Sequence, residues 1–269
     1  MVKCLGCVAS YMHREDKDGN YLTISKNQIF EYLDVDHIFL DEFPLDYIPP
    51  VIFIVYSRLN AINFQKSKML SINSRFLPPK TSQLYSIKIT NNAIMNLFND
   101  AFKAATSTTI LDLSNNEISY IDCDAFTGLV MLKTLKISSN KLRKVDECYF
   151  KDLNTLDLLH IDQNEIAEVE DNSFKSLTTL KTLTLKQNAI RNANRKIFSG
   201  LEKLEDLNLS VNRLKILKAE TFSELKMLKN LDLSSNIIEV IHKAVFSGLN
   251  NLKSINFENP TRPNLKDAP

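Results

Sequence analysis

Residues 132–153 read LKTLKISSNKLRKVDECYFKDL, and this stretch decides the fold. Apolar residues alternate with polar ones up to Asn140, and Phe150 follows ten residues later. The same frame recurs every 24 residues, without an insertion or a deletion, at Asn92, Asn116, Asn140, Asn164, Asn188, Asn212 and Asn236. A fixed period of this length predicts a solenoid of stacked coils.

Each frame predicts one strand and one turn. In L-x-L the two apolar side chains point into the core and the residue between them points outward. The asparagine amide carries donors and an acceptor that satisfy backbone groups of neighbouring coils, and the phenylalanines form an aromatic row on the far side. We therefore predict an α/β fold, a horseshoe-shaped solenoid with a concave parallel β-sheet and an irregular convex side rich in turns and short helices.

The frame weakens towards both ends of the chain. Ser67 and Phe43 stand in the asparagine slot of the early coils, and Pro260 stands there in the last one. Terminal repeats are atypical because they cap the core. The expected organisation is a degenerate N-terminal cap over residues 1–34, a solenoid over residues 35–258, and a loose tail with an incomplete cap over residues 259–269.

The repeat L-x-x-L-x-L-x-x-N-x-L-x-x-L-x-x-x-x-F-x-x-L resembles the typical subfamily of leucine-rich repeats over about residues 35–258. That subfamily occurs mainly in extracellular proteins, including Toll-like receptor ectodomains and secreted insect immune proteins. The resemblance implies a leucine-rich-repeat solenoid and a non-catalytic, extracellular binding module, which takes a protein or glycan partner on its concave face in innate immunity or cell adhesion.

The chain departs from this family at its caps. Of the cysteines that flank the N-terminal cap only Cys4 and Cys7 are present, which the resemblance implies are the remnant of a disulfide-bonded cap. The motif that opens the C-terminal cap is echoed as Asn259-Pro260-Thr261 without a cysteine. A missing cap exposes a strand edge, so we expect either a truncated chain or a partner at that edge, for example a dimer.

Composition leaves the compartment open. The formal net charge is +1, so binding to nucleic acid or to a membrane surface through bulk charge is not expected. The longest apolar run, Val51–Tyr56, is far too short to span a bilayer. The first ten residues hold too short an apolar stretch for a signal peptide, so either the protein is cytosolic or this chain lacks its true start. The alternative function is therefore an intracellular leucine-rich-repeat scaffold or adaptor.

The cysteines give two further alternatives. Cys4 and Cys7 could form half of a zinc site with His13, but a second ligand pair is missing from the sequence, so we expect no metal and no cofactor. Cys123 and Cys148 lie seven and eight residues past their ladder asparagines, at nearly the same angular position on successive coils. That position predicts a disulfide bond, and the alternative is two free cysteines.

Catalysis finds little support. His160 points outward from a predicted strand, with Asp162 two residues on and Ser138 on the neighbouring strand. The sequence supplies neither a nucleophile elbow nor an oxyanion site for this trio. We predict that the protein is not an enzyme.

The outward positions of the sheet are where a partner is expected. Their middle row is polar and mixed in charge, and reads Lys88, Asp112, Lys136, His160, Thr184, Asn208, Asp232 and Asn256. Leu158 is an apolar outward residue ringed by polar ones, which indicates an interface. The predicted partner-binding residues are therefore Lys136, Leu158, His160, Asp162 and Thr184; the alternative is a solvated sheet face.

One N-glycosylation acceptor occurs, Asn208-Leu209-Ser210. Because Asn208 is itself an outward strand residue, a glycan there would stand on the sheet. In a secreted protein it would direct large partners towards the N-terminal half.

Overall fold

The computed structural model describes residues 21–24, 37–41, 47–48, 50–55, 58–79 and 81–258. It divides into two units, residues 1–132 and 133–269, which are described separately. The sequence predictions for Cys4, Cys7, His13 and the tail after residue 258 lie outside the described residues. The predicted cap boundaries remain predictions.

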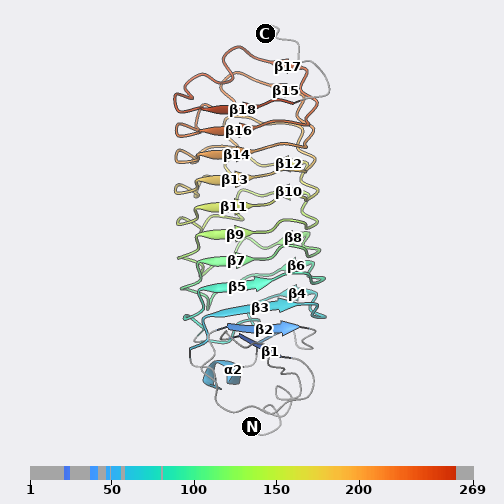
Figure 1. Ribbon diagram of the computed structural model, residues 1–269, viewed down its shortest axis with the longest axis vertical. Coiled ribbons are helices and arrows are strands. Elements are labelled where there is room, and N and C mark those ends of the chain that lie inside the picture. The colour runs from blue at the N-terminus through green and yellow to red at the C-terminus, as the bar shows by residue number, and fades with distance from the viewer. Residues whose placement is uncertain are drawn as a thin grey trace. The chain divides into compact units, whose positions relative to one another are not determined.

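Residues 1–132 contain a sheet of long parallel strands and a smaller sheet of short ones (Figure 1). Each long strand pairs in register with the strand one coil further on. The long strands are β1 (Tyr21–Ile24), β2 (His37–Asp41), β3 (Ala61–Gln65), β5 (Ser86–Ile89) and β7 (Ile110–Asp112). The short ones are β4 (Ser71–Ile72), β6 (Asn96–Leu97) and β8 (Tyr120–Ile121).

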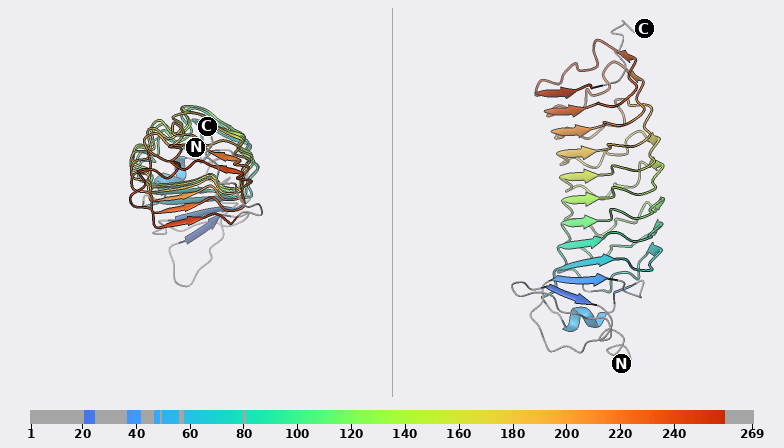
Figure 2. Two further views of the ribbon diagram at one scale, coloured as in Figure 1. Left: turned by 90° about the horizontal axis from the view of Figure 1, so that it is seen from above. Right: turned by 45° about the vertical axis from the view of Figure 1, so that its right-hand side comes forward.

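Residues 133–269 repeat this arrangement, with long strands on one side of each coil and short strands and turns on the others (Figure 2). The long strands are β9 (Thr134–Lys136), β11 (Leu158–His160), β13 (Thr182–Thr184), β14 (Asp206–Asn208), β16 (Asn230–Asp232) and β18 (Ser254–Asn256). The short strands form the pairs β10 (Lys144–Val145) with β12 (Glu168–Val169) and β15 (Ile216–Leu217) with β17 (Val240–Ile241).

The predicted parallel-strand solenoid is confirmed, but the prediction of a side rich in short helices is wrong. Among the described residues the one helix is α2 (Pro50–Val55). The segments expected to be helical are turns, and they contain residues with left-handed backbone such as Asp100, Asn172 and Glu220. A left-handed residue ends an α-helix, so these short segments cannot build one.

The predicted inside and outside positions hold along the regular coils. The central leucines of the long strands are at most 2% exposed, namely Leu135, Leu159, Leu183, Leu207 and Leu231. The phenylalanines are equally buried from Phe102 to Phe222. Phe150 and Phe174 stack with ring centroids 6.0 Å apart. The two rows together make the apolar core.

The ladder asparagines connect the coils. Asn164 accepts a hydrogen bond from the Leu142 N–H at 3.0 Å and donates to the carbonyl oxygen of Ile137 at 3.0 Å, both one coil earlier. In the early coil that lacks the asparagine, the Ser67 N–H and hydroxyl instead donate to Asn92 Oδ1 at 2.7 and 2.8 Å. A serine therefore takes the end position of the ladder, because it still satisfies the amide of the next coil.

Gly200 and Gly248 differ in how closely the backbone of the preceding coil approaches them. Gly200 and Gly248 have nearly equal φ angles of 84° and 83°. A Cβ at Gly200 would lie 2.3 Å from the carbonyl oxygen of Lys175, whereas at Gly248 the nearest atom is Lys226 Nζ at 3.6 Å. Gly248→Ala should destabilise by about 1 kcal/mol through backbone strain alone.

Gly200→Ala should destabilise by at least about twice that amount, because the backbone must also move. Urea unfolding of both variants measures the difference. Equal losses would mean that the close approach at Gly200 is wrong.

Candidate functional site

The five residues predicted to bind a partner lie together on one face of residues 133–258. We call this face, formed by the outward side chains of β9, β11, β13, β14, β16 and β18, the open face. His160 pairs in register with Lys136 on one side and Thr184 on the other. Leu158 is half-buried between Thr134 and Thr182. The structure brings these residues together, and their role in binding remains a prediction.

The Asp162 carboxylate has a structural role on the open face. Its carboxylate accepts hydrogen bonds from the Thr184 hydroxyl, from the Lys186 N–H at 3.2 Å and from the Ser138 hydroxyl at 3.2 Å. These donors come from the coils on both sides of β11. The carboxylate is therefore held in place and contributes a fixed negative charge to the open face.

The trio of Ser138, His160 and Asp162 is arranged differently from a catalytic triad. In a triad the serine hydroxyl donates to the imidazole, and the carboxylate orients the imidazole from its other nitrogen. Here the Ser138 hydroxyl donates directly to the Asp162 carboxylate. The contact joins neighbouring coils and gives no activation of the serine.

A groove runs over the open face from β11 to β18, with a volume of about 650 Å³. Of the predicted residues it includes His160, Asp162 and Thr184 but neither Lys136 nor Leu158. The lining also includes five residues that the sequence did not assign to partner binding, namely Asp206, Asn230, Asp232, Ser254 and Asn256. All of them occupy outward strand positions, so the repeat frame gave their direction but not the hollow that they line.

The groove carries an excess of negative charge. Its charged lining residues are Asp162, Asp206 and Asp232 against Lys186. Asp206 accepts from Asn230 Nδ2 at 2.6 Å, and Asp232 accepts from the N–H and hydroxyl of Ser234. Within the described part of the chain neither of these two carboxylates has a cationic partner. Both are available to a positively charged group of a ligand.

The predicted glycosylation site lies in the same groove. Asn208 lines it, and its Oδ1 accepts from the N–H and hydroxyl of Ser210 at 2.9 and 2.7 Å. Ser210 is buried, with 2% of its surface exposed. A glycan attached to Asn208 Nδ2 would stand in the groove.

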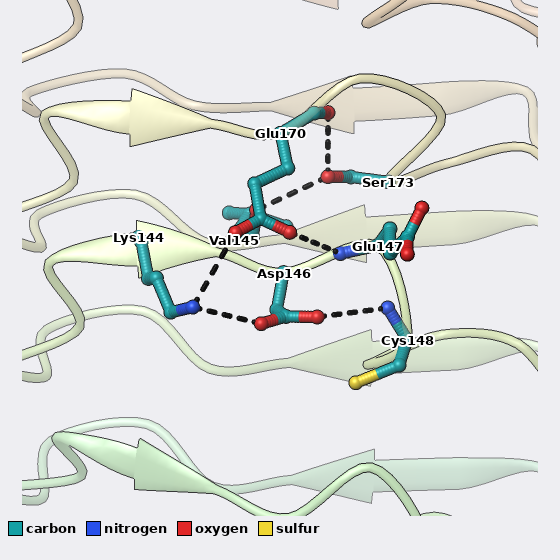
Figure 3. Close-up of polar contacts among 7 residues, drawn as sticks. All are labelled: Lys144, Val145, Asp146, Glu147, Cys148, Glu170 and Ser173. Carbon is teal, nitrogen blue, oxygen red and sulfur yellow. Dashed lines mark hydrogen bonds and ion pairs between the residues drawn. The ribbon is translucent and has the colours of Figure 1, made fainter.

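Away from the open face, the short strands β10 and β12 carry a charged network (Figure 3). Lys144 Nζ lies 2.8 Å from Asp146 and 3.4 Å from Glu170. Asp146 also accepts from the N–H of Cys148, and Glu170 from the N–H of Glu147. Cys123 and Cys148 are both disulfide-bonded, and their pairing with each other remains a prediction. The network therefore fixes the turn on which a disulfide cysteine sits.

This network predicts a pH dependence. The hydrogen bond from Lys144 holds the pKa of Asp146 below its usual range, and the N–H of Cys148 acts in the same direction. A depressed carboxyl pKa stabilises the fold above the unfolded-state pKa, and the contribution is lost as pH falls through the folded-state pKa. Lys144→Met should therefore lower the melting temperature at neutral pH, modestly because the pair is exposed, and the difference from wild type should vanish in acid.

Thermal melts of wild type and Lys144→Met from pH 7 down to about pH 2 measure this difference. Lys186→Met is the matched control, because this exposed lysine forms no ion pair with any of the residues that the structure describes. A difference that stayed constant over this range would show that the Asp146 pair does not contribute.

The chain is similar to leucine-rich-repeat proteins in both sequence and structure. The family model described as "Leucine rich repeat" matches residues 82–142, 131–190, 154–214, 178–238 and 207–259. No curated protein matches the chain. The predicted resemblance to leucine-rich-repeat proteins of the receptor-ectodomain type is confirmed by solved structures.

One similar structure is TLR13 in a complex with ssRNA13, at 26% identity and a TM-score of 0.68, covering 86% of this chain and 37% of the other. Another is Toll of Drosophila in its complex with Spatzle, at 20% identity and a TM-score of 0.70, with 84% and 35% covered. A third is the mouse RP105/MD-1 complex, at 21% identity and a TM-score of 0.75, with 89% and 42% covered.

The chain thus spans well under half the length of these proteins. TLR13 has a similar fold and is in complex with single-stranded RNA. The net charge of this chain is therefore not enough to exclude a nucleic-acid partner. Among the described residues no helix is long and apolar enough to cross a membrane. The repeat matches together span residues 82–259, and the chain belongs to the leucine-rich repeat family.

Proposed function

We propose that this chain is a non-catalytic recognition module that binds a protein partner in the groove of its open face. The observation that carries the proposal is the pair of carboxylates, Asp206 and Asp232, that line the groove without a cationic partner among the described residues. A protein segment with an arginine or lysine side chain would satisfy both the charge and the polar lining.

The charge of the groove favours protein over RNA. Phosphate groups bind through lysine and arginine, and the groove has one lysine against three aspartates. The similar structures hold both kinds of ligand, since Toll is in complex with Spatzle and TLR13 with RNA. RNA binding is therefore an outcome of the test and not part of the proposal.

An extracellular location is part of this proposal. It is supported by the two disulfide-bonded cysteines and by the receptor ectodomains among the similar structures. Disulfides persist in oxidising compartments and are rare in the cytosol. The alternative of an intracellular scaffold predicts reduced cysteines, which a mass measurement under non-reducing conditions distinguishes.

Selection of a phage-displayed random peptide library on the full chain tests the binding site. We expect the selected peptides to be basic, and the double variant Asp206→Asn with Asp232→Asn to weaken their binding at least about tenfold, the effect of losing charge-assisted contacts. Glu202→Gln, an exposed carboxylate outside the groove lining, is the matched control and should leave binding unchanged.

A single-stranded RNA oligonucleotide is the second probe. Binding of this oligonucleotide that becomes tighter in the double variant would contradict the proposal, as would peptides that bind the double variant and wild type equally. The selection is repeated on Asn208→Gln produced in a secreting host. If a glycan occupies the groove, this variant should bind the peptides more tightly than the glycosylated wild type.

A further inference from the structure

Four large apolar side chains are exposed in or directly beside the short strands β4, β6 and β8 of residues 1–132. We call them the flank patch, and they are Leu70 at 54%, Met95 at 38%, Phe98 at 39% and Tyr120 at 46% exposed. The Met95 N–H donates to the carbonyl of Leu70, and the Tyr120 N–H to that of Met95, so the backbones of three consecutive coils are adjacent here. The rings of Phe98 and Tyr120 lie 6.1 Å apart.

The same repeat positions are charged elsewhere in the chain. Lys144 is 24 residues after Tyr120, and Asp146 is 48 residues after Phe98. In residues 133–269 these two side chains form the solvated network of Figure 3. The repeat positions of Phe98 and Tyr120 therefore accept charged side chains in other coils, and those coils still fold. Exposed apolar residues that gather where the fold does not require them mark an interaction surface.

Charges at the two ends of the flank patch have opposite signs. The coil at its beginning carries Lys68 and Arg75, which are exposed, and the coil at its end carries Glu117 and Asp122. Within the described part of the chain none of these four side chains has an ion-pair partner. In the coil between them Asp100 forms an ion pair with Lys103 at 3.2 Å, so these two charges compensate each other.

We propose that the flank patch binds the flank patch of a second copy of this chain about a twofold axis. In a twofold interface the same surface meets itself in the opposite direction. The basic coil of one copy then faces the acidic coil of the other, and the four apolar side chains meet at the centre. This is the arrangement of an apolar core with a polar rim that protein interfaces show.

The flank patch is separate from the groove and from the C-terminal strand edge at which a dimer is predicted from the sequence. A dimer at the C-terminal edge would not depend on residues 68–122. The two sites are therefore distinguishable by substitution.

Sedimentation velocity of the full chain over a range of concentrations up to about 100 µM tests the proposal. We expect a reversible dimer, and Phe98→Ser should raise its dissociation constant at least about tenfold, as loss of a central aromatic residue does. Ile216→Ser, which removes an exposed apolar side chain from β15 (44% exposed), should leave the constant unchanged. Circular dichroism confirms that each variant is folded.

Charge reversal tests the orientation. Lys68→Glu and Glu117→Lys should each weaken the dimer, and the double variant should restore it, because the two side chains face each other across the twofold axis. A chain that is monomeric at all concentrations overturns the proposal. So does a dimer that Phe98→Ser leaves intact, or a double variant that associates more weakly than both single ones.

Discussion

Replacing Phe174 by alanine is expected to lower the free energy of unfolding by about 3–5 kcal/mol, the range for large buried side chains. Phe174 is fully buried and stacks on Phe150 with an interplanar angle of 13°. Its ring fills the space between coils, so its removal leaves a cavity that the stacked backbone cannot close. Equilibrium urea unfolding followed by circular dichroism measures the loss.

Lys186→Ala is the control for this substitution, because Lys186 is exposed on the open face. Its removal should change stability by less than about 0.5 kcal/mol. Because each repeat contacts only its neighbours, a destabilised coil can unfold separately from the rest. The slope of the urea transition is therefore compared with that of wild type. Equal stability of the two variants would show that the inside and outside positions are wrongly assigned.

Replacing Asn164 by alanine is expected to destabilise the fold by about 1–3 kcal/mol, the loss for a buried polar group left without a partner. The substitution leaves the Leu142 N–H without its acceptor, which now lies 3.0 Å away. The Ile137 carbonyl loses its 3.0 Å bond from Asn164 and keeps the one from Asn140 Nδ2 at 3.1 Å. Asn164 is only 9% exposed, so water replaces the amide poorly.

Asn188 gives a matched comparison for this effect. It makes equivalent bonds, to the Ile166 N–H at 3.0 Å and the Ile161 carbonyl at 3.1 Å, but is half-buried. Asn188→Ala should therefore destabilise less than Asn164→Ala, since water reaches the vacated groups. Urea unfolding of both variants decides the point. A larger loss at Asn188 would mean that the ladder does not stabilise the fold through buried hydrogen bonds.

The long strands, the ladder and the aromatic row could be predicted from sequence because each coil repeats its own local pattern. Leu159 and Asn164 follow from the spacing within a single coil, and the structure buries both. That turns replace the expected short helices could not be predicted in this way. Left-handed residues such as Asn172 interrupt the segments between Phe174 and the short strands, and the spacing of apolar residues does not report the sign of φ.

The partner surface shows the same division. The repeat frame placed His160, Thr184 and Asp232 on the outward side of their strands, and the structure agrees. The repeat frame could not distinguish Asp162 from Asp206 and Asp232. The Asp162 carboxylate accepts hydrogen bonds from Thr184 and Ser138, whereas Asp206 and Asp232 lack a cationic partner among the described residues.

The sequence by itself determined the period, the direction of each side chain and the family, because these depend on spacing within one coil. The tertiary structure alone decided where the groove lies and which charges remain unpaired. It also decided that Leu70, Met95 and Tyr120 of three different coils are neighbours. The physical reason is that such contacts form between residues about one repeat apart, where register and side-chain pairing across coils, and not local preference, set the outcome.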